Sequence, residues 1–322
     1  MLSDLHVKVI MVMLFRLYIN SLYFGIIGVY AFKLKYVMNG INEDKWETHN
    51  GIPIIKAATV STVYNDARQD ALYKKEEKSW WFRYRAEVIK CLVEKYFDNT
   101  RIIWDIGAGN GYSSWILQNA GYSVAAMEPS YEACRNAIKR GIKSVYCGAL
   151  DDEGVHDDSL ESAMVLDVIE HLEDDEGFLC LLYKKLSEDA YLLITVPAFM
   201  SLWSSNDINA GHFRRYSYSE LKDRCEKAGF TVLYGNYFMR FCYLPILLIR
   251  VIMVNMGIIH RTGHKTEKEA KRVAKLEHGE KKGFVRSALR MLQKIELGRI
   301  QMGRSVPYGS SLVMVLKKRG VK

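Results

Sequence analysis

The chain has 322 residues, 49% of them hydrophobic and 25% charged, a balance that excludes a disordered chain and leaves room for a sizeable core. This length favours one domain with additions over two independent domains. The six cysteines include no C-x-x-C pair, which argues against a zinc or disulfide scaffold and for a reducing compartment. The formal charge of +8 fits either nucleic acid or an anionic membrane face as a partner.

The chain starts with a hydrophobic leader, residues 1–38. Its segment 9–32 is almost entirely apolar and long enough to cross a bilayer. Arg16 within a lone span costs at least ~2.5 kcal/mol on insertion scales. Three interpretations therefore stay open: a membrane helix, an interfacial or buried helix, and a false start upstream of Met38.

Residues 39–73 are polar and interrupted by glycine and proline, and we expect a linker there. Residues 74–96 predict a helix with an unusual cluster of aromatic and basic side chains at 80–85. One interpretation packs these aromatics on a sheet and leaves the arginines in solvent.

A glycine-rich loop follows the apolar run at 102–106, which is typical of a buried strand that runs into a tight turn. Residues 112–120 then predict a helix. A strand, a glycine loop and a helix form the nucleotide site of a doubly wound α/β sheet. A dinucleotide fingerprint would need glycine at position 112, where this chain has Tyr112. The loop glycines are Gly107, Gly109 and Gly111.

Two acidic residues indicate which ligand this loop binds. Asp105 would repel a pyrophosphate, but it suits a ligand that carries an ammonium and a sulfonium. Glu128 closes the next apolar run, 122–127, where such sheets place an acid that accepts hydrogen bonds from ribose hydroxyls.

At these residues the chain resembles the class I S-adenosylmethionine-dependent methyltransferases, whose first motif is D-x-G-x-G-x-G and whose second strand ends in Asp or Glu. The resemblance implies a doubly wound, seven-stranded, Rossmann-like sheet and S-adenosylmethionine as cofactor. In the similar subgroup, W-W-F-x-x-R precedes the first strand and its arginine reaches the methionine carboxylate. The cofactor-binding residues that the resemblance implies are Arg85, Asp105, Gly107, Ala108, Gly109, Gly111, Glu128, Leu150, Asp151 and Asp167.

The remaining pattern continues the alternation of strands and helices. We expect helices at 131–140 and 219–227, strands at 144–147, 162–166, 190–196 and 230–237, and a last, antiparallel strand at 312–316.

Residues 167–172, D-V-I-E-H-L, resemble a stretch of ubiquinone-biosynthesis-type methyltransferases in which the histidine faces the acceptor. His171 has this functional interpretation and a structural one. For Glu170 we favour a carboxylate at a helix start, stabilised by the helix dipole.

The segment 202–217 leaves the carboxyl end of a central strand, where ligands bind in open α/β sheets. It resembles the L-W-S-x-x-D-x-x-x-G-H-x-R-R-Y stretch of bacterial methyltransferases found with envelope polysaccharide and lipid biosynthesis. Paired arginines suit a phosphate or carboxylate, although we expect one of the two to cap a helix end. The expected acceptor-binding residues are Trp203, Asp207, Arg214, Arg215 and Tyr216.

Residues 241–304 form an insertion before the last strand, apolar at first and basic later. Its basic part holds few aromatic residues, which argues against a single-stranded nucleic-acid surface. A membrane-surface attachment and a helical cap over the substrate both stay open.

We expect a methyltransferase domain at 74–240 and 305–322, acting in the cytoplasm, with attachment to the inner face of the membrane as an extension of that expectation. The acceptor would be small or lipid-linked. His171 or His212 would serve as base for a hydroxyl acceptor. No ligand spacing indicates a metal, and nothing indicates an oligomeric state. Two alternatives are a non-catalytic S-adenosylmethionine-binding regulator and an NAD-dependent oxidoreductase, which Asp105 and Tyr112 argue against.

Overall fold

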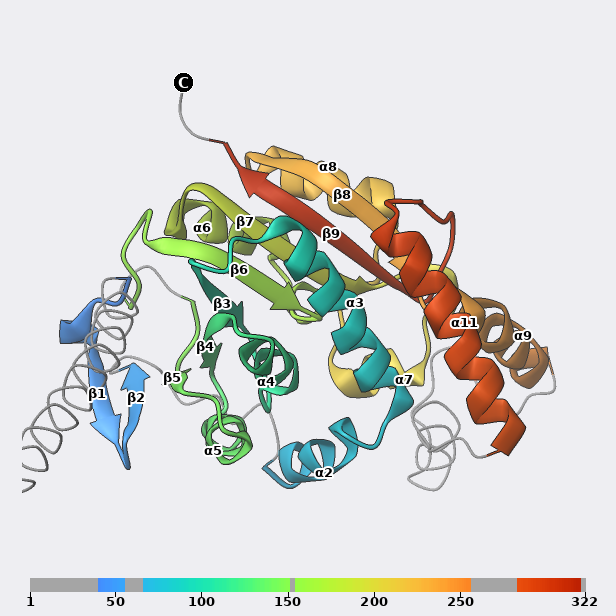
Figure 1. Ribbon diagram of the computed structural model, residues 1–322, viewed down its shortest axis with the longest axis horizontal. Helices are drawn as coiled ribbons and strands as arrows, with labels where there is room; N and C mark the ends of the chain where they lie inside the picture. Colours follow the sequence, from blue (N-terminus) through green and yellow to red (C-terminus); the bar gives the residue numbers. More distant parts are fainter. Residues whose placement is uncertain (1–39, 56–65, 151–153, 256–282, 320–322) are drawn as a thin grey trace, which may run out of the picture.

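The computed structural model describes residues 40–55, 66–150, 154–255 and 283–319. The leader at 1–38, Asp151 and the middle of the insertion lie outside these residues. The centre is a nine-stranded sheet in the order β1-β2-β5-β4-β3-β6-β7-β9-β8 (Figure 1). The strands are β1 (Trp46–His49), β2 (Ile52–Ile55), β3 (Ile102–Ile106), β4 (Ser123–Glu128), β5 (Ser144–Cys147), β6 (Leu160–Leu166), β7 (Leu186–Pro197), β8 (Phe230–Phe238) and β9 (Ser311–Lys318).

Helices cover both faces of this sheet (Figure 1). The α-helices are α2 (Asp66–Glu76), α3 (Trp80–Tyr96), α4 (Tyr112–Asn119), α5 (Tyr131–Arg140), α6 (Asp175–Lys185), α7 (Ser205–Ala210), α8 (Tyr218–Lys227), α9 (Arg240–Asn255) and α11 (Gly283–Gln301). Short 3₁₀ turns are η1 (Glu43–Lys45), η2 (Ile169–His171) and η3 (Met200–Leu202).

Alternate residues of the central strands face the two helical layers. On β3, Ile103 packs in the cluster that contains residues of α3, α4 and α11, whereas Trp104 packs in the cluster of α6 and α8. Both side chains are almost fully buried. A sheet buried on both faces explains why its parallel strands read as continuous apolar runs in the sequence.

The five strands β5, β4, β3, β6 and β7 are parallel, and β9 pairs antiparallel with β7 and β8. Strand order reverses beside β3, because the chain runs outward to β5 and then returns to β6 on the other side of β3. Ligands of doubly wound sheets bind at the carboxyl ends of strands where the order reverses. The seven expected strands are β3 to β9, and the predicted Rossmann-like sheet is confirmed.

Two strands were not predicted. The hairpin of β1 and β2 lies in the segment expected as a linker and extends the sheet by pairing Ile54 with Cys147. Its turn is Asn50-Gly51, with φ of 49° and 80°. Asn-Gly with positive φ at both positions is a strong hairpin signal. Each strand has only four residues, too few for a clear alternation of apolar and polar residues.

The helix expected at 74–96 is two helices. α2 ends at Glu76, and α3 begins at Trp80 after Ser79, whose side chain accepts a hydrogen bond from the backbone N–H of Trp81. Serine is a favoured N-cap because its hydroxyl satisfies a free N–H of the first turn. Part of α2 also falls within the expected linker. The expected helical insertion is confirmed, since α9 and α11 lie between β8 and β9.

Candidate active site

The loop between β3 and α4 has its three glycines in the left-handed region. Gly107, Gly109 and Gly111 have φ of 76°, 54° and 74°, which side chains rarely adopt. A Cβ on Gly107 would lie 2.5 Å from Val168, and one on Gly111 3.0 Å from Ala137. A Cβ on Gly109 would meet nothing within 4 Å, so the loop is open at this point. The backbone can thus approach a ligand there.

Glu128, the last residue of β4, fixes this loop. Its carboxylate accepts hydrogen bonds from the backbone N–H groups of Gly109 (2.8 Å) and Ser130 (2.9 Å). Burial raises its pKa, and these two donors oppose the increase. The predicted ribose contact stays a prediction. In this structure Glu128 positions the open corner of the glycine loop.

Asp105 lies under the loop and is almost fully buried. One carboxylate oxygen accepts a hydrogen bond from Ser114 Oγ (2.6 Å), while the other has no partner among the described residues. Burial raises the pKa of Asp105 to about 7, against the lowering effects of Ser114 and Arg85. A half-satisfied buried carboxylate is suited to a cationic ligand.

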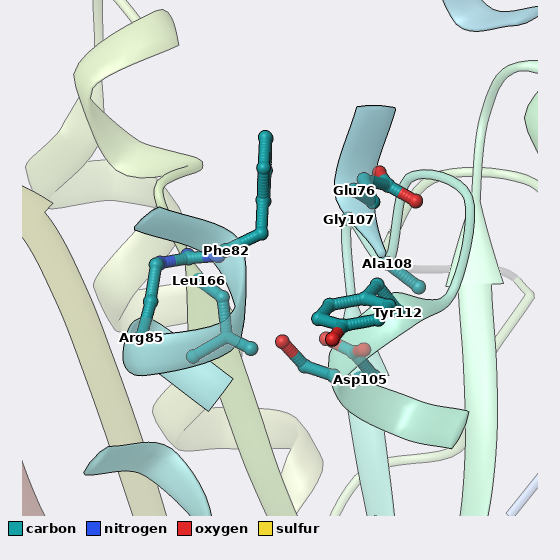
Figure 2. Close-up of a pocket in the computed structure, with 9 residues that line it drawn as sticks. Glu76, Phe82, Arg85, Asp105, Gly107, Ala108, Tyr112 and Leu166 are labelled. Carbon is teal, nitrogen blue, oxygen red and sulfur yellow. The ribbon is translucent and has the colours of Figure 1, made fainter. Parts of the chain in front are cut away.

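A pocket opens above Asp105. Figure 2 shows Phe82, Arg85 and Leu166 on one side of it, facing Asp105 and Tyr112 on the other. The residues that line the pocket are Glu76, Phe82, Arg85, Asp105, Gly107, Ala108, Tyr112, Ser113 and Leu166. Four of the predicted cofactor-binding residues therefore lie together in this pocket: Arg85, Asp105, Gly107 and Ala108.

Five lining residues were not predicted: Glu76, Phe82, Tyr112, Ser113 and Leu166. Phe82 belongs to the aromatic and basic cluster at 80–85. Tyr112 directly follows the glycine loop, and Leu166 directly precedes Asp167. Glu76 had no sequence signal, because its role depends on α2 folding over the loop. There it forms a buried ion pair with Arg140 (2.6 Å) and accepts a hydrogen bond from Asn110 (3.2 Å).

Arg85 reaches the pocket from α3 and is already paired. Its Nη2 lies 3.0 Å from a carboxylate oxygen of Asp167 and donates to Thr195 Oγ1 (3.0 Å). Its Nε is buried without a partner among the described residues. The pair joins α3 to the carboxyl ends of β6 and β7. Of the two residues predicted for the adenine, Leu150 is buried in the core cluster with Trp46 and does not line the pocket, and Asp151 lies outside the described residues.

A second group of polar side chains, which includes two histidines, lies beyond the end of β6. The rings of His171 and His212 are 4.6 Å apart between centroids and nearly perpendicular. Asp207 Oδ1 lies 3.0 Å from His212 Nδ1 and accepts a hydrogen bond from Arg215 Nε (2.7 Å). Although burial opposes ionisation of Asp207, His212 and Arg215 outweigh it and lower its pKa.

Asp207 also closes a capping box at the start of α7, where its carboxylate accepts from the backbone and hydroxyl of Ser204. It is 1% exposed, so it orients His212 and Arg215 instead of contacting an acceptor itself. The segment 202–217 thus contains a short helix, α7, that positions His212 and Arg215 through Asp207.

Arg214 and Tyr216 differ from their predicted role. Arg214 forms an ion pair with Asp175 (2.7 Å), and the hydroxyl of the buried Tyr216 donates to the same carboxylate (2.6 Å). Asp175 begins α6, so Arg214 is the arginine of the pair that serves a helix end. Both residues attach the loop to the fold. Trp203 is half-buried directly after η3.

Glu170 differs most from expectation. It lies in the middle of η2 with 0% exposure, and neither carboxylate oxygen has a hydrogen-bond partner among the described residues. Burial, followed by the charge of Asp167, raises its pKa well above the usual value. One ligand atom each from Glu170, His171 and His212 lie within 4.8 Å of one another, a grouping that can hold a metal ion. The spacing along the chain could not reveal it, because His212 comes from a distant segment.

The comparisons with known proteins agree with one another in pointing to methyltransferases. Residues 80–234 match a family described as a methyltransferase domain. A probable S-adenosylmethionine-dependent methyltransferase of Mycolicibacterium smegmatis is 24% identical over 159 residues, which cover 48% of this chain and 61% of that protein. The match thus spans about three fifths of the length of this curated relative.

The chain is also similar to two solved structures. One is phosphoethanolamine N-methyltransferase 2 of Haemonchus contortus, in complex with phosphomonomethylethanolamine and S-adenosylhomocysteine. It has a TM-score of 0.50 at 15% identity, with 83% of this chain and 62% of that chain covered. A possible histamine N-methyltransferase of Thermotoga maritima has a TM-score of 0.45 at 18% identity, with 79% and 95% covered.

Proposed function

We propose that this chain is an enzyme that methylates a small or lipid-linked acceptor. The premise is that residues 80–234 form a methyltransferase domain of the class I S-adenosylmethionine-dependent kind. S-adenosylmethionine is its cofactor. The acceptor is an amphiphile, such as an envelope polysaccharide precursor, a polyprenyl or a quinone-like molecule, held at the cytoplasmic face of a membrane. The ubiquinone-like subgroup remains part of this proposal.

The observation that carries the cofactor assignment is the pairing of an open glycine loop with a half-satisfied carboxylate. Gly109 leaves space for close backbone approach, and Asp105 offers an unpartnered oxygen in the pocket. A pyrophosphate would be repelled by this carboxylate, whereas the cationic cofactor would be attracted. The residues therefore fit S-adenosylmethionine better than a dinucleotide.

The bound cofactor supplies an activated methyl group on a sulfonium, so the protein mainly aligns the acceptor and excludes water. Glu128 holds the glycine loop in its open shape, and the Arg85–Asp167 pair holds α3 against the strand ends. Arg85 keeps a free Nε–H for the carboxylate of the methionine moiety. These contacts preform the site before the cofactor binds.

His171 and His212 belong to the acceptor side. They lie just beyond Asp167, which pairs with pocket residue Arg85. Since Asp207 holds His212 Nδ1, the other ring nitrogen is available to the acceptor. Arg215 is attached to the same carboxylate and adds positive charge beside the acceptor.

Support for the membrane surface comes from α9 and α11. Arg240 N, at the start of α9, donates to Glu296 of α11, so the two helices lie together at one end of the sheet (Figure 1). Large apolar side chains exposed on them are Leu244, Leu248, Val285, Met291, Leu292 and Ile295. Arg286, Arg290 and Lys294 interleave with the apolar residues of α11. An apolar face bordered by basic residues is typical of interfacial helices. Within the described part of the chain, no helix meets the length and hydropathy needed to cross a bilayer.

Methyl-labelled S-adenosylmethionine, incubated with the full chain and with membrane or soluble extracts, tests the function. We expect label in an organic-soluble product of the membrane fraction only. Asp105→Ala and Glu128→Ala should reduce the incorporation by weakening cofactor binding. Label confined to the soluble fraction would contradict the membrane acceptor, and no label in any fraction would contradict the enzyme.

The role of His212 can be separated from cofactor binding. His212→Ala should bind S-adenosylhomocysteine as the wild type does and lose about 100-fold or more in turnover, the range of a removed general base. His156→Ala is the matched control, because His156 is exposed on the connection from β5 to β6. Full activity of His212→Ala would contradict the assignment.

A further inference from the structure

The carboxylate of Glu170 needs an explanation that the fold does not supply. A buried carboxylate without hydrogen bonds costs several kcal/mol, and buried charges are normally paired or bind metals. Glu170 is fully buried, and both of its oxygens have no partner among the described residues. One of its carboxylate oxygens and one ring nitrogen from each of His171 and His212 lie within 4.8 Å of one another.

The two segments that carry these groups are fixed to each other. The backbone N–H of Phe213 donates to the carbonyl oxygen of Glu170 (2.7 Å), which places His212 beside His171. Asp207 holds Nδ1 of His212, so Nε2 is the nitrogen left to bind a ligand. A carboxylate that orients the far nitrogen of a histidine is the usual support of a metal-binding imidazole.

We propose that Glu170, His171 and His212 bind one divalent transition-metal ion, with zinc as the best match to two imidazoles and a carboxylate. Such a set occurs in catalytic zinc sites and leaves at least one position open. In tetrahedral coordination, ligand atoms about 2.1 Å from a zinc ion are about 3.4 Å from one another. The three ligand atoms lie within 4.8 Å of one another, so bringing them onto an ion needs closure of up to about 1.4 Å.

The ion would lie beside the cofactor pocket. Leu166 lines that pocket, and the next residue, Asp167, pairs with Arg85 of the pocket wall. Asp167 is itself engaged by Arg85 and Thr195 and is not needed as a ligand. The open position of the ion suits an oxygen of the acceptor, which makes a hydroxyl the group to be methylated. With Nε2 of His212 on zinc, the ion would replace His212 as the group that promotes loss of the hydroxyl proton, and His212 would act by holding the ion. This last step rests on the proposed function, whereas the metal site does not.

Zinc binding by the tag-free full chain tests the site. After treatment with a chelator and its removal, Zn²⁺ is titrated in competition with a chromophoric chelator. We expect one equivalent per chain, and an affinity on the order of 100-fold lower in Glu170→Gln, His171→Ala and His212→Ala, each of which removes a ligand. His156→Ala should bind zinc as the wild type does.

S-adenosylhomocysteine binding by the same variants shows that they are folded and separates the two proposals. Loss of zinc binding with retained S-adenosylhomocysteine binding supports the metal site. A wild type that binds S-adenosylhomocysteine but no zinc would overturn the metal site and leave the methyltransferase intact. Zinc binding that Glu170→Gln and His212→Ala leave unchanged would also overturn it.

Discussion

Glu296 and Glu170 are both buried carboxylates, 6% and 0% exposed, but their surroundings are opposite. Glu296 on α11 accepts hydrogen bonds from the Tyr84 hydroxyl and from the backbone N–H groups of Met239 and Arg240. Glu170 accepts none at its carboxylate from the described residues. The first joins α3 and α11 to the start of α9, while the second joins no elements through its side chain.

This difference separates structural carboxylates from those that await a ligand. A carboxylate surrounded by hydrogen-bond donors gives each donor an acceptor and receives hydrogen bonds in return. Glu296 does this at the N-terminus of α9. Asp105 is intermediate, with one oxygen bonded to Ser114 and one unpartnered among the described residues. In the function proposed above, the unpartnered oxygen of Asp105 faces the cofactor and those of Glu170 lie on the acceptor side. The contrast can be tested at each carboxylate.

The largest loss of stability is expected at Glu296. Glu296→Ala leaves the two buried donors of Tyr84 and Met239, and the partly buried N–H of Arg240, without an acceptor. The free energy of unfolding should fall by about 2–6 kcal/mol, at 1–3 kcal/mol for each buried donor. Urea denaturation measures the change. Glu94→Ala, which removes an exposed partner of Lys90, is the control and should stay within about 0.5 kcal/mol of the wild type. A loss at Glu296 no larger than that of the control would contradict its structural role.

Asp105 should make stability depend on pH. Its folded pKa of about 7 lies above the ordinary value of 3.8, so between these values the folded state holds a proton that the unfolded state has released. Stability should therefore fall as pH rises through this window, by about 4 kcal/mol in total at 1.36 kcal/mol per pKa unit, of which about 2.5 kcal/mol falls between pH 5 and pH 8.

Asp105→Asn should remove this part of the pH dependence. The measurement is the free energy of unfolding at pH 5 and pH 8 for both proteins without ligand. Because other buried carboxylates also titrate, the difference between the two proteins isolates Asp105. Equal slopes for wild type and variant would show that Asp105 is ionised throughout.

Glu170→Gln should have the opposite effect to a substitution at Glu296. Glutamine has a similar shape and cannot ionise, so the variant avoids the cost of keeping an unpartnered acid buried, whether ionised or protonated. The metal-free variant should be as stable as the metal-free wild type or more stable by about 1–2 kcal/mol. Urea denaturation in the presence of a chelator measures it. A clear loss of stability would mean that Glu170 holds the fold as Glu296 does.

The smallest change in stability is expected at the exposed apolar residues of α11. Leu292→Ser with Ile295→Ser replaces exposed side chains and should alter the free energy of unfolding by only about 0.5 kcal/mol. Binding to vesicles that contain anionic lipid, measured by sedimentation, should fall severalfold. Unchanged vesicle binding would contradict a role of this face at the membrane.

The sheet could be predicted well from the sequence because its strands are continuous apolar runs that end in turns. The glycine loop and Asp105 were predictable for a similar reason, since they are adjacent in the chain. The hairpin of β1 and β2 was missed because its strands are short, although Asn50-Gly51 was a usable signal.

Roles that depend on distant partners could not be predicted. Arg214 and Tyr216 belong to a motif that predicts acceptor binding. Their contact with Asp175 depends on the fold, which brings this residue to both of them. From the sequence, Glu170 is expected to be an ordinary acidic residue at a helix start. Its significance is an absence of donors among the described residues, which a sequence does not display.

Calorimetric titration of the full chain with S-adenosylhomocysteine tests the central claim most directly. The account predicts one site per chain, an affinity that Asp105→Ala and Glu128→Ala reduce, and no binding of NAD. If the protein bound NAD and failed to bind S-adenosylhomocysteine, the pocket above Asp105 would not be a methyl-donor site and the account would be contradicted.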